Sequence, residues 1–284
     1  MTRLLSAYFI WILVLVCLLV RFPNEITAFE GTKRQPPFTV YDGTLYANKP
    51  NLARFGIQPI RIIGNQFWHN GRPNEVLPSK QKVQEIAHQF AGSAQPIVLD
   101  IEHWRLQGPT SIVEANLEKY LTILEWFRET EPQAVLGYYG TVPIRDYWRA
   151  IKDKRRTEWF NENDRLRHLA ATVDVFFPSL YTFYNDQEGW KKYAIAQISE
   201  ARRYGTGKPV IVFLWPEFHD SNRWLKGTYL PANFWKLQLE TAKEYADGIV
   251  IWGGWGQSNK PAPWDKTAPW WKVTQEFLRG LQNH

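Results

Sequence analysis

The sequence contains a single cysteine, Cys17, among 284 residues. With no second cysteine the chain cannot form an internal disulfide, and no thiol nucleophile is available after residue 17. A Gly-rich phosphate-binding turn after an early strand is also missing. Ser179 lacks the flanking glycines of a nucleophile elbow. These absences disfavour disulfide scaffolds, nucleotide-binding folds and hydrolases that use a serine or cysteine nucleophile.

A long apolar run occupies residues 4–20, between Arg3 and Arg21. This pattern predicts a secretory signal or an uncleaved N-terminal membrane anchor within residues 1–28, and the run is long for a signal and nearly long enough to span a bilayer. We therefore expect a secreted or periplasmic protein, or one anchored to a membrane by this segment. A linker at 29–37 and a single domain at 38–284 complete the predicted organisation, and we expect a monomer.

Aromatic residues make up 15% of the chain, and 15 of them are Trp. Trp is large and seldom completely buried, so this excess indicates a role beyond packing. A sugar ring stacks its apolar C–H face on indole while its hydroxyls bind polar groups. The formal net charge of +6 weakly favours an anionic partner, although the basic run at 152–156 is typical of a solvated helix face. The charge alone would suit an acidic polysaccharide, a nucleic acid or an anionic membrane surface, whereas the Trp content indicates sugar. We therefore expect a polysaccharide or glycan partner, including an anionic one, and no nucleic-acid partner.

Short β-rich apolar runs alternate with amphipathic stretches after the linker. Strands are expected at 38–41, 60–64, 97–102, 134–139, 173–181, 210–215 and 248–252. Helices are expected at 79–90, 111–128, 189–204 and 231–246. This alternation predicts an α/β fold, an irregular TIM-type β/α barrel with seven parallel strands. An open doubly wound sheet is the alternative, but that fold usually carries the missing Gly-rich turn.

Asp100 and Glu102 lie two residues apart in the predicted strand at 97–102. Alternate side chains of a strand point to opposite faces, so both carboxyls should project to the same side. Burial of two unpaired charges is costly, which leaves a catalytic pair, a metal site or a structural ion pair as explanations. His103 should point away from the acids, which disfavours a metal site even if His219 supplied a further ligand. We predict no metal and no cofactor.

Glu102 is the candidate general acid. Cleavage of a glycosidic bond requires protonation of a poor leaving group, and a carboxyl with a raised pKa does this near neutral pH. Asp100 supplies a like-charged neighbour, and it can also bind a substrate amide.

Aromatic and polar residues also follow other predicted strands, at the edge where a β/α barrel forms its active site. Tyr181 is a catalytic candidate, because its hydroxyl can orient a substrate group and stabilise developing charge. A strand-end tyrosine that binds only the barrel rim is the alternative interpretation. The candidates for substrate binding are Tyr138, Tyr139, Trp104, Arg105, Trp215, Glu217, Trp252 and Trp255.

Four motifs, taken in order, resemble the hyaluronidase family of glycoside hydrolases. Asp-Ile-Glu-His-Trp-Arg at 100–105 is similar to the family's Asp-x-Glu-x-Trp-Arg, and Gly-Tyr-Tyr-Gly at 137–140 is similar to its next strand end. Pro-Ser-Leu-Tyr at 178–181 is similar to its Pro-Ser-x-Tyr, and Gly-Ile-Val-Ile-Trp-Gly at 248–253 to its closing strand. The barrel of that family is irregular and has seven strands.

The resemblance implies a retaining, substrate-assisted mechanism at an N-acetylhexosamine. In that mechanism Glu102 is the general acid and base, and Asp100 positions the substrate acetamido group. Tyr181 assists, together with Tyr138 or Tyr139. The substrate's own acetamido oxygen acts as nucleophile and forms an oxazolinium ion. Chitinase-like enzymes share this chemistry.

The resemblance further implies that Trp252 lines the sugar subsite and that Arg105 meets a uronic carboxylate. The chain departs from the animal enzymes in lacking their disulfide cysteines and in its Thr-Val-Pro-Ile segment at 141–144. Hyaluronan and another N-acetylhexosamine-containing glycan are therefore both open as substrates. Two other functions also remain open: a barrel glycosidase in which Glu217 is a conventional nucleophile, and a non-catalytic glycan-binding barrel.

Overall fold

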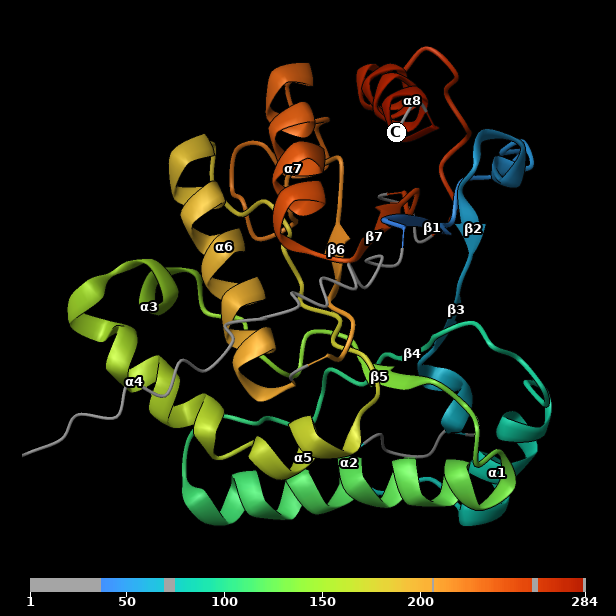
Figure 1. Cartoon of the computed structure of the whole chain (residues 1–284), viewed down its shortest axis with the longest axis vertical. Helices are drawn as coiled ribbons and strands as arrows, with labels where there is room; N and C mark the ends of the chain where they lie inside the picture. Colours follow the sequence, from blue (N-terminus) through green and yellow to red (C-terminus); the bar gives the residue numbers. More distant parts are fainter. Residues whose placement is uncertain (1–36, 69–74, 206, 257–259, 283–284) are drawn as a thin grey trace, which may run out of the picture. The chain divides into compact units, whose positions relative to one another are not determined.

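The centre of the fold consists of parallel strands, and helices pack on the outer side of these strands (Figure 1). The computed structural model describes residues 37–68, 75–205, 207–256 and 260–282. Residues 36–284 form one compact unit. The predicted signal or anchor at 1–28, Cys17 and all but the last residue of the predicted linker lie outside the described residues. No helix among the described residues has the length and apolar character needed to cross a membrane.

The seven strands are arranged in two parallel sheets. The larger sheet has the order β2-β1-β7-β6 and consists of β1 (Thr39–Thr44), β2 (Gln58–Pro59), β6 (Ile211–Leu214) and β7 (Gly248–Gly253). The smaller sheet has the order β3-β4-β5 and consists of β3 (Arg61–Ile63), β4 (Ile97–Leu99) and β5 (Leu136–Tyr138). Because every pairing is parallel, the carboxyl ends of the strands lie at one edge, where such folds place their sites.

Irregular segments join the two sheets on both sides. β2 and β3 are separated by one residue, so a single run pairs first with β1 and then with β4. On the other side, residues 176–179 form only isolated parallel bridges, to Tyr139, Val210 and Phe213. The prediction of a continuous strand at 173–181 is therefore wrong, since Pro178 has no N–H to donate to a ladder. The runs still follow one another in circular order, as in the predicted irregular β/α barrel.

Helices follow most strands and pack against one another. The four predicted helices are present as α1 (Lys80–His88), α2 (Thr110–Thr130), α6 (Gln187–Tyr204) and α7 (Ala232–Tyr245). Further helices that the sequence analysis did not predict are α3 (Tyr147–Ile151), α4 (Asp153–Asp164), α5 (Arg167–Thr172) and α8 (Pro269–Gln282), with short 3-10 turns at Leu52–Phe55 and Asn65–Phe67. The pairs α1 with α2, α6 with α7, and α7 with α8 are in contact. Side-chain caps fix several helix starts: Ser79 accepts a hydrogen bond from the Lys82 N–H, and Asp186 from the Gly189 N–H.

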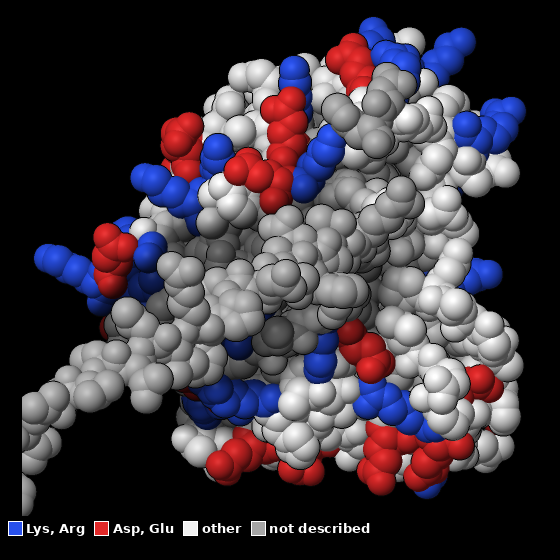
Figure 2. Space-filling view, viewed as in Figure 1, with Lys and Arg blue, Asp and Glu red and all other residues white. Residues whose placement is uncertain are grey.

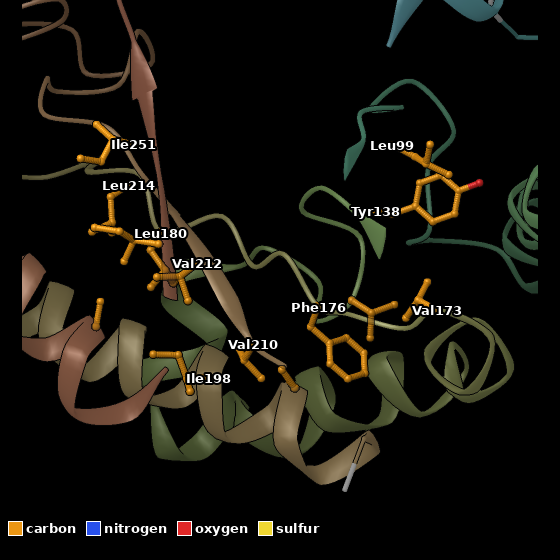
Figure 3. Packing of buried hydrophobic residues seen from close by; sticks show 14 of the residues in the cluster. Leu99, Tyr138, Val173, Phe176, Leu180, Ile198, Val210, Val212, Leu214 and Ile251 are labelled. Carbon is orange, nitrogen blue, oxygen red and sulfur yellow. The ribbon is translucent and has the colours of Figure 1, made fainter. Parts of the chain in front are cut away.

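The apolar residues form an inner cluster between the strands and a larger outer cluster between strands and helices. Figure 3 shows part of the outer cluster, which includes Leu99 and Tyr138. The inner cluster includes Val98 and Tyr139, so adjacent residues of β4 and of the β5 end point to opposite sides of the sheet. Gly137 also faces inward, where a Cβ atom would lie 2.9 Å from the Phe177 ring. This alternation decides which strand-end residues reach the interior.

Charges of both signs are interspersed over the face seen in Figure 2. The basic run at 152–156 lies at the start of α4, where Arg155 pairs with Glu158 at 3.3 Å and Arg156 with Asp153 at 3.1 Å. These pairs lie within the helix surface, where exposed ion pairs contribute little to stability. The basic run is thus the solvated helix face that its sequence predicts.

Candidate active site

Two hollows open at the carboxyl ends of the strands, and they share one wall. The larger, of about 230 Å³, we term the aromatic hollow, and the smaller, of about 200 Å³, the adjacent hollow. The aromatic hollow is lined by Ile62, Asp100, Glu102, Tyr139, Arg145, Tyr181, Phe213, Trp215, His219, Asp220, Trp252 and Trp255. Glu102, Tyr139 and Arg145 also line the adjacent hollow. Of the eleven site residues that the sequence predicted, seven therefore meet in one hollow.

Asp100 and Glu102 lie side by side in the wall of the aromatic hollow. Strand β4 ends at Leu99, three residues earlier than predicted, so both acids lie on the loop that follows it. The Asp100 N–H donates to the carbonyl of Ile63 at 2.7 Å, which continues the pairing of β3 with β4 by one residue. The expectation that both carboxyls project to the same side is met, because both line this hollow.

The two carboxyls have different surroundings. Burial, and secondarily the charge of Glu102, raise the pKa of Asp100 to about 7, while the charge of Arg145 acts in the opposite direction. The Oδ1 atom of Asp100 is buried and has no hydrogen-bond partner among the described residues. The Glu102 side chain is 55% exposed, and its Oε2 lies 3.7 Å from an Arg145 guanidinium nitrogen. The pair thus combines a half-buried carboxyl that holds a proton near neutral pH with a more open one.

Two of the three predicted tyrosines face the aromatic hollow. The hydroxyls of Tyr139 and Ser179 lie 3.0 Å apart, and the rings of Tyr139 and Tyr181 are tilted against each other at 5.8 Å. Burial raises the pKa of Tyr181 well above its ordinary value, so its phenol stays protonated and can donate a hydrogen bond.

Tyr138 does not reach either hollow, because the alternation along the strand points it into the outer cluster. Its hydroxyl donates to the carbonyl of Tyr120 at 2.9 Å. The hydroxyl of Tyr120 in turn donates to the carbonyls of Ile101 and Trp104, at 2.8 and 3.1 Å. Tyr138 and Tyr120 therefore hold the loop that carries the two acids from behind, a supporting role that the sequence analysis did not predict.

Trp104 and Arg105 line the adjacent hollow and not the aromatic one. Trp104 is buried, and its ring contacts those of Trp68, His103 and Tyr120 with centroid distances between 5.2 and 5.7 Å. Arg105 accepts a hydrogen bond on its carbonyl from the Asn116 side chain at 3.0 Å. These contacts anchor the loop after β4 and keep Arg105 in the wall of the adjacent hollow.

Glu217 lines neither hollow. Its Oε1 accepts a hydrogen bond from the Tyr46 hydroxyl at 3.2 Å, and burial raises its pKa to about 7. Trp215, two residues earlier, does line the aromatic hollow, together with Trp252 and Trp255 from the end of β7 and the loop after it. The structure therefore places Glu217 outside the aromatic hollow, although Trp215, two residues earlier, lines it.

Arg145 and His219 line the aromatic hollow but were not among the predicted site residues. Arg145 lies six residues after Tyr139 in a loop with no periodic pattern, so spacing gave no indication of it. His219 Nδ1 accepts a hydrogen bond from the Ser221 N–H at 3.1 Å, which leaves the proton of the neutral ring on Nε2. Burial and the charge of Arg145 lower the pKa of His219. At neutral pH the hollow thus contains one fixed cation and one neutral imidazole.

No group of three or more His, Cys, Asp or Glu side chains that could hold a metal ion occurs within the described ranges. His103 contacts Trp68 and Trp104 at ring distances of 4.9 and 5.3 Å. It therefore packs among aromatic rings of the loop, as expected from a side chain that points away from the two acids.

Replacement of Tyr138 by phenylalanine should lower the stability of the protein and leave its turnover almost unchanged. Loss of a buried hydrogen bond to the Tyr120 carbonyl should reduce the free energy of unfolding by about 1 kcal/mol. Turnover by Tyr138→Phe should stay within about threefold of the unchanged protein. Tyr181→Phe, which removes a hydroxyl from the hollow itself, should lower turnover by about 10²-fold with little loss of stability. Denaturant unfolding and steady-state kinetics on both variants check this, and equal kinetic losses would contradict it.

Comparison with known proteins supports the fold at the level of three-dimensional structure. No protein-family model matches the chain, and no curated protein matches it in sequence. Among solved structures, the fold of this chain is similar to that of a hyaluronidase. Bee venom hyaluronidase superposes with a TM-score of 0.60 at 17% identity, over 87% of this chain and 98% of that one. These values confirm the predicted fold class and the structural resemblance to hyaluronidases.

Two further structures show how far this likeness extends. Bee venom hyaluronidase in complex with a hyaluronic acid tetramer gives a TM-score of 0.56 at 18% identity, over 87% of this chain and 97% of that chain. The endo-β-1,4-mannanase of Thermotoga petrophila gives 0.51 at 11% identity, over 81% of this chain and 59% of that chain. At such identities the likeness concerns the fold, so the chemistry has to be argued from the residues of this chain.

Proposed function

We propose that this protein is a glycoside hydrolase that cleaves a glycan at an N-acetylhexosamine by a retaining, substrate-assisted mechanism. The observation that carries the proposal is the pair of unlike carboxyls in one wall of the aromatic hollow. Asp100 is half-buried and has one buried oxygen without a hydrogen-bond partner among the described residues, whereas Glu102 is open to an incoming substrate. Such a pair can divide the work of orienting a substrate and of transferring a proton.

Glu102 is the proton donor in this mechanism. A sugar bound over Glu102 brings its glycosidic oxygen within hydrogen-bond reach of the carboxylic acid. Glu102 gives its proton to the glycosidic oxygen as the bond from that oxygen to C1 breaks. In the second half-reaction the same carboxylate takes a proton from the water that attacks C1, which regenerates the acid.

Asp100 acts on the acetamido group. The Asp100 carboxyl, which lines the aromatic hollow, accepts a hydrogen bond from the acetamido N–H, and this turns the acetamido oxygen toward C1. That oxygen forms a bond to C1 as the leaving group departs, giving a cyclic oxazolinium ion. Tyr181, which lines the same hollow, donates a hydrogen bond to the acetamido group, and Trp215 and Trp252 form apolar walls for the sugar ring.

A conventional carboxylate nucleophile is the alternative mechanism within the same class of enzyme. It would require a second acid facing the substrate, at about 5 Å from the proton donor. Glu217, the candidate for that role, is hydrogen-bonded to Tyr46 and lines neither hollow. This arrangement argues against Glu217 as the nucleophile.

Incubation of the purified protein with hyaluronan, chondroitin, chitin oligomers and bacterial surface glycans, followed by an assay for new reducing ends, tests the proposal. We expect cleavage of at least one N-acetylhexosamine-containing glycan. A thiazoline that mimics the oxazolinium ion should inhibit that cleavage competitively. Cleavage that the thiazoline leaves unchanged would indicate a carboxylate nucleophile, and glycan binding without any cleavage would indicate a non-catalytic barrel.

A further inference from the structure

Trp148 and Tyr184 form an exposed aromatic pair at the rim that carries the two hollows. Trp148 belongs to α3, after the β5 end, and Tyr184 lies between the segment 176–181 and α6. Their exposed fractions are 43% and 41%, and neither residue lines either hollow. Two large aromatic side chains that stay open to water beside a site are unusual enough to indicate a binding surface.

The pair is held in a fixed geometry. The Trp148 indole N–H donates to the Tyr184 hydroxyl at 3.0 Å, and the ring centroids lie 5.1 Å apart. The buried Tyr147 supports both rings at centroid distances of 5.0 Å, and its own hydroxyl donates to Asp186 at 3.3 Å. Because the supporting residues fix both rings before any ligand arrives, binding on this surface costs little side-chain entropy.

The pair is continuous with the aromatic hollow. Arg145, which lines that hollow, precedes Trp148 by three residues. Phe183 directly precedes Tyr184, lies 5.9 Å below the Arg145 guanidinium and contacts the His219 ring at 4.8 Å. Arg145 and Phe183 thus connect the exposed pair with the wall of the aromatic hollow, through neighbouring positions in the chain and through their mutual contact.

We propose that Trp148 and Tyr184 form a distal platform on which a sugar ring of a long glycan stacks while another part of the same glycan occupies the aromatic hollow. The inference rests on the proposed function, and it adds that the substrate is a polymer bound at more than one subsite. The flat apolar ring faces match the C–H face of a pyranose. Lys152, with its Nζ 4.8 Å from the Trp148 ring centroid, adds a positive charge for an acidic substituent.

Binding of short and long glycans to the full chain carrying Glu102→Gln tests the platform, since this change prevents turnover. The probes are the disaccharide and hexasaccharide of chitin and the tetrasaccharide and decasaccharide of hyaluronan, titrated by calorimetry. We expect the longer probe of the series that binds to have the higher affinity. Adding Trp148→Ala should reduce that affinity about tenfold and leave the shorter probe unaffected. Tyr184→Phe, which keeps the aromatic ring, should retain most of the difference in affinity between the longer and the shorter probe.

Trp224→Ala is the matched control, because Trp224 is 85% exposed and makes no ring contact within the described part of the chain. It should leave both affinities unchanged. Thermal melting shows whether Trp148→Ala is folded, and Trp148→Phe replaces it if it is not, with a smaller loss expected.

The outcomes distinguish the two proposals. Equal affinities for the short and the long probe would overturn the platform and leave the function of the hollow in place. A higher affinity of the long probe that Trp148→Ala does not reduce would have the same consequence. If no probe binds in either series, the proposed function fails and the platform fails with it. A loss of equal size for the short and the long probe would assign the aromatic pair to the support of the hollow, and would also overturn the platform.

Discussion

Replacement of Glu102 by glutamine is expected to reduce turnover by about 10³-fold or more while the protein folds and binds glycan normally. The amide has the size of the carboxyl but cannot give a proton to the glycosidic oxygen or take one from water. The Glu102 side chain is 55% exposed, and its one ion pair within the described ranges is that with Arg145 at 3.7 Å, so loss of its charge leaves no buried group unsatisfied. Steady-state kinetics and calorimetric binding on the same preparation measure both effects.

Glu217→Gln is the matched control for this experiment, because it makes the same chemical change in an acid outside both hollows. We expect it to keep turnover within about fivefold of the unchanged protein, because Glu217 is hydrogen-bonded to Tyr46 outside both hollows. A collapse of turnover in Glu217→Gln together with full activity in Glu102→Gln would reverse the assignment of the two acids. Equal, small effects in both would argue against an acid-catalysed reaction in this hollow.

Replacement of Asp100 by asparagine is expected to lower turnover by about 10²-fold and, in the opposite direction, to stabilise the protein above neutral pH. The folded state holds a proton on Asp100 up to about pH 7, whereas the unfolded chain releases it near the ordinary value of 3.8. Between these pKa values the folded state binds more protons, so the free energy of unfolding falls as the pH rises. The contribution of Asp100 is fully present below about pH 4 and is lost above about pH 7.

The side-chain amide introduced by Asp100→Asn does not titrate. The free energy of unfolding of the variant therefore does not fall with rising pH on account of this group. A shift of roughly 3 pKa units corresponds to about 4 kcal/mol, and partial exposure of the group reduces the expected gain at pH 8 to about 2 kcal/mol. Denaturant unfolding of both proteins from pH 4 to pH 9 measures the difference curve. Subtracting one pH curve from the other cancels the contributions of the other groups that titrate in this range, including Glu217. A difference that does not change with pH would show that Asp100 ionises normally in the folded protein.

The two acids could be predicted from the sequence because their shared orientation depends only on local spacing. Asp100 and Glu102 meet on one side even though the strand ends at Leu99, since the chain continues in extended form for one more paired residue. The two adjacent tyrosines could not be resolved in the same way. Parallel strands are apolar on both faces, so hydrophobicity does not tell whether Tyr138 or Tyr139 faces inward. Gly137 gives the only local indication, as the inner face has no room for a side chain there.

Other features depend on contacts between distant segments. Arg145 and His219 come from loops, and only the assembled barrel brings them next to Glu102 and Tyr181. Helix α4 buries few residues, so its sequence lacks the apolar period that predicts a helix. Helix α8 is different, because its buried Trp270, Trp271, Thr274 and Leu278 follow that period and could have been predicted.

The two hollows share a wall, so the binding of a ligand in one is coupled to the binding of a ligand in the other. Glu102 and Arg145 face both spaces, and a carboxylate–guanidinium pair at 3.7 Å changes its hydration and its mutual attraction when either side is filled. Ligands in the two spaces therefore share a coupling free energy, and each alters the affinity of the other by the same factor. Under the proposed function, two glycan fragments that occupied both hollows would therefore leave in coupled steps.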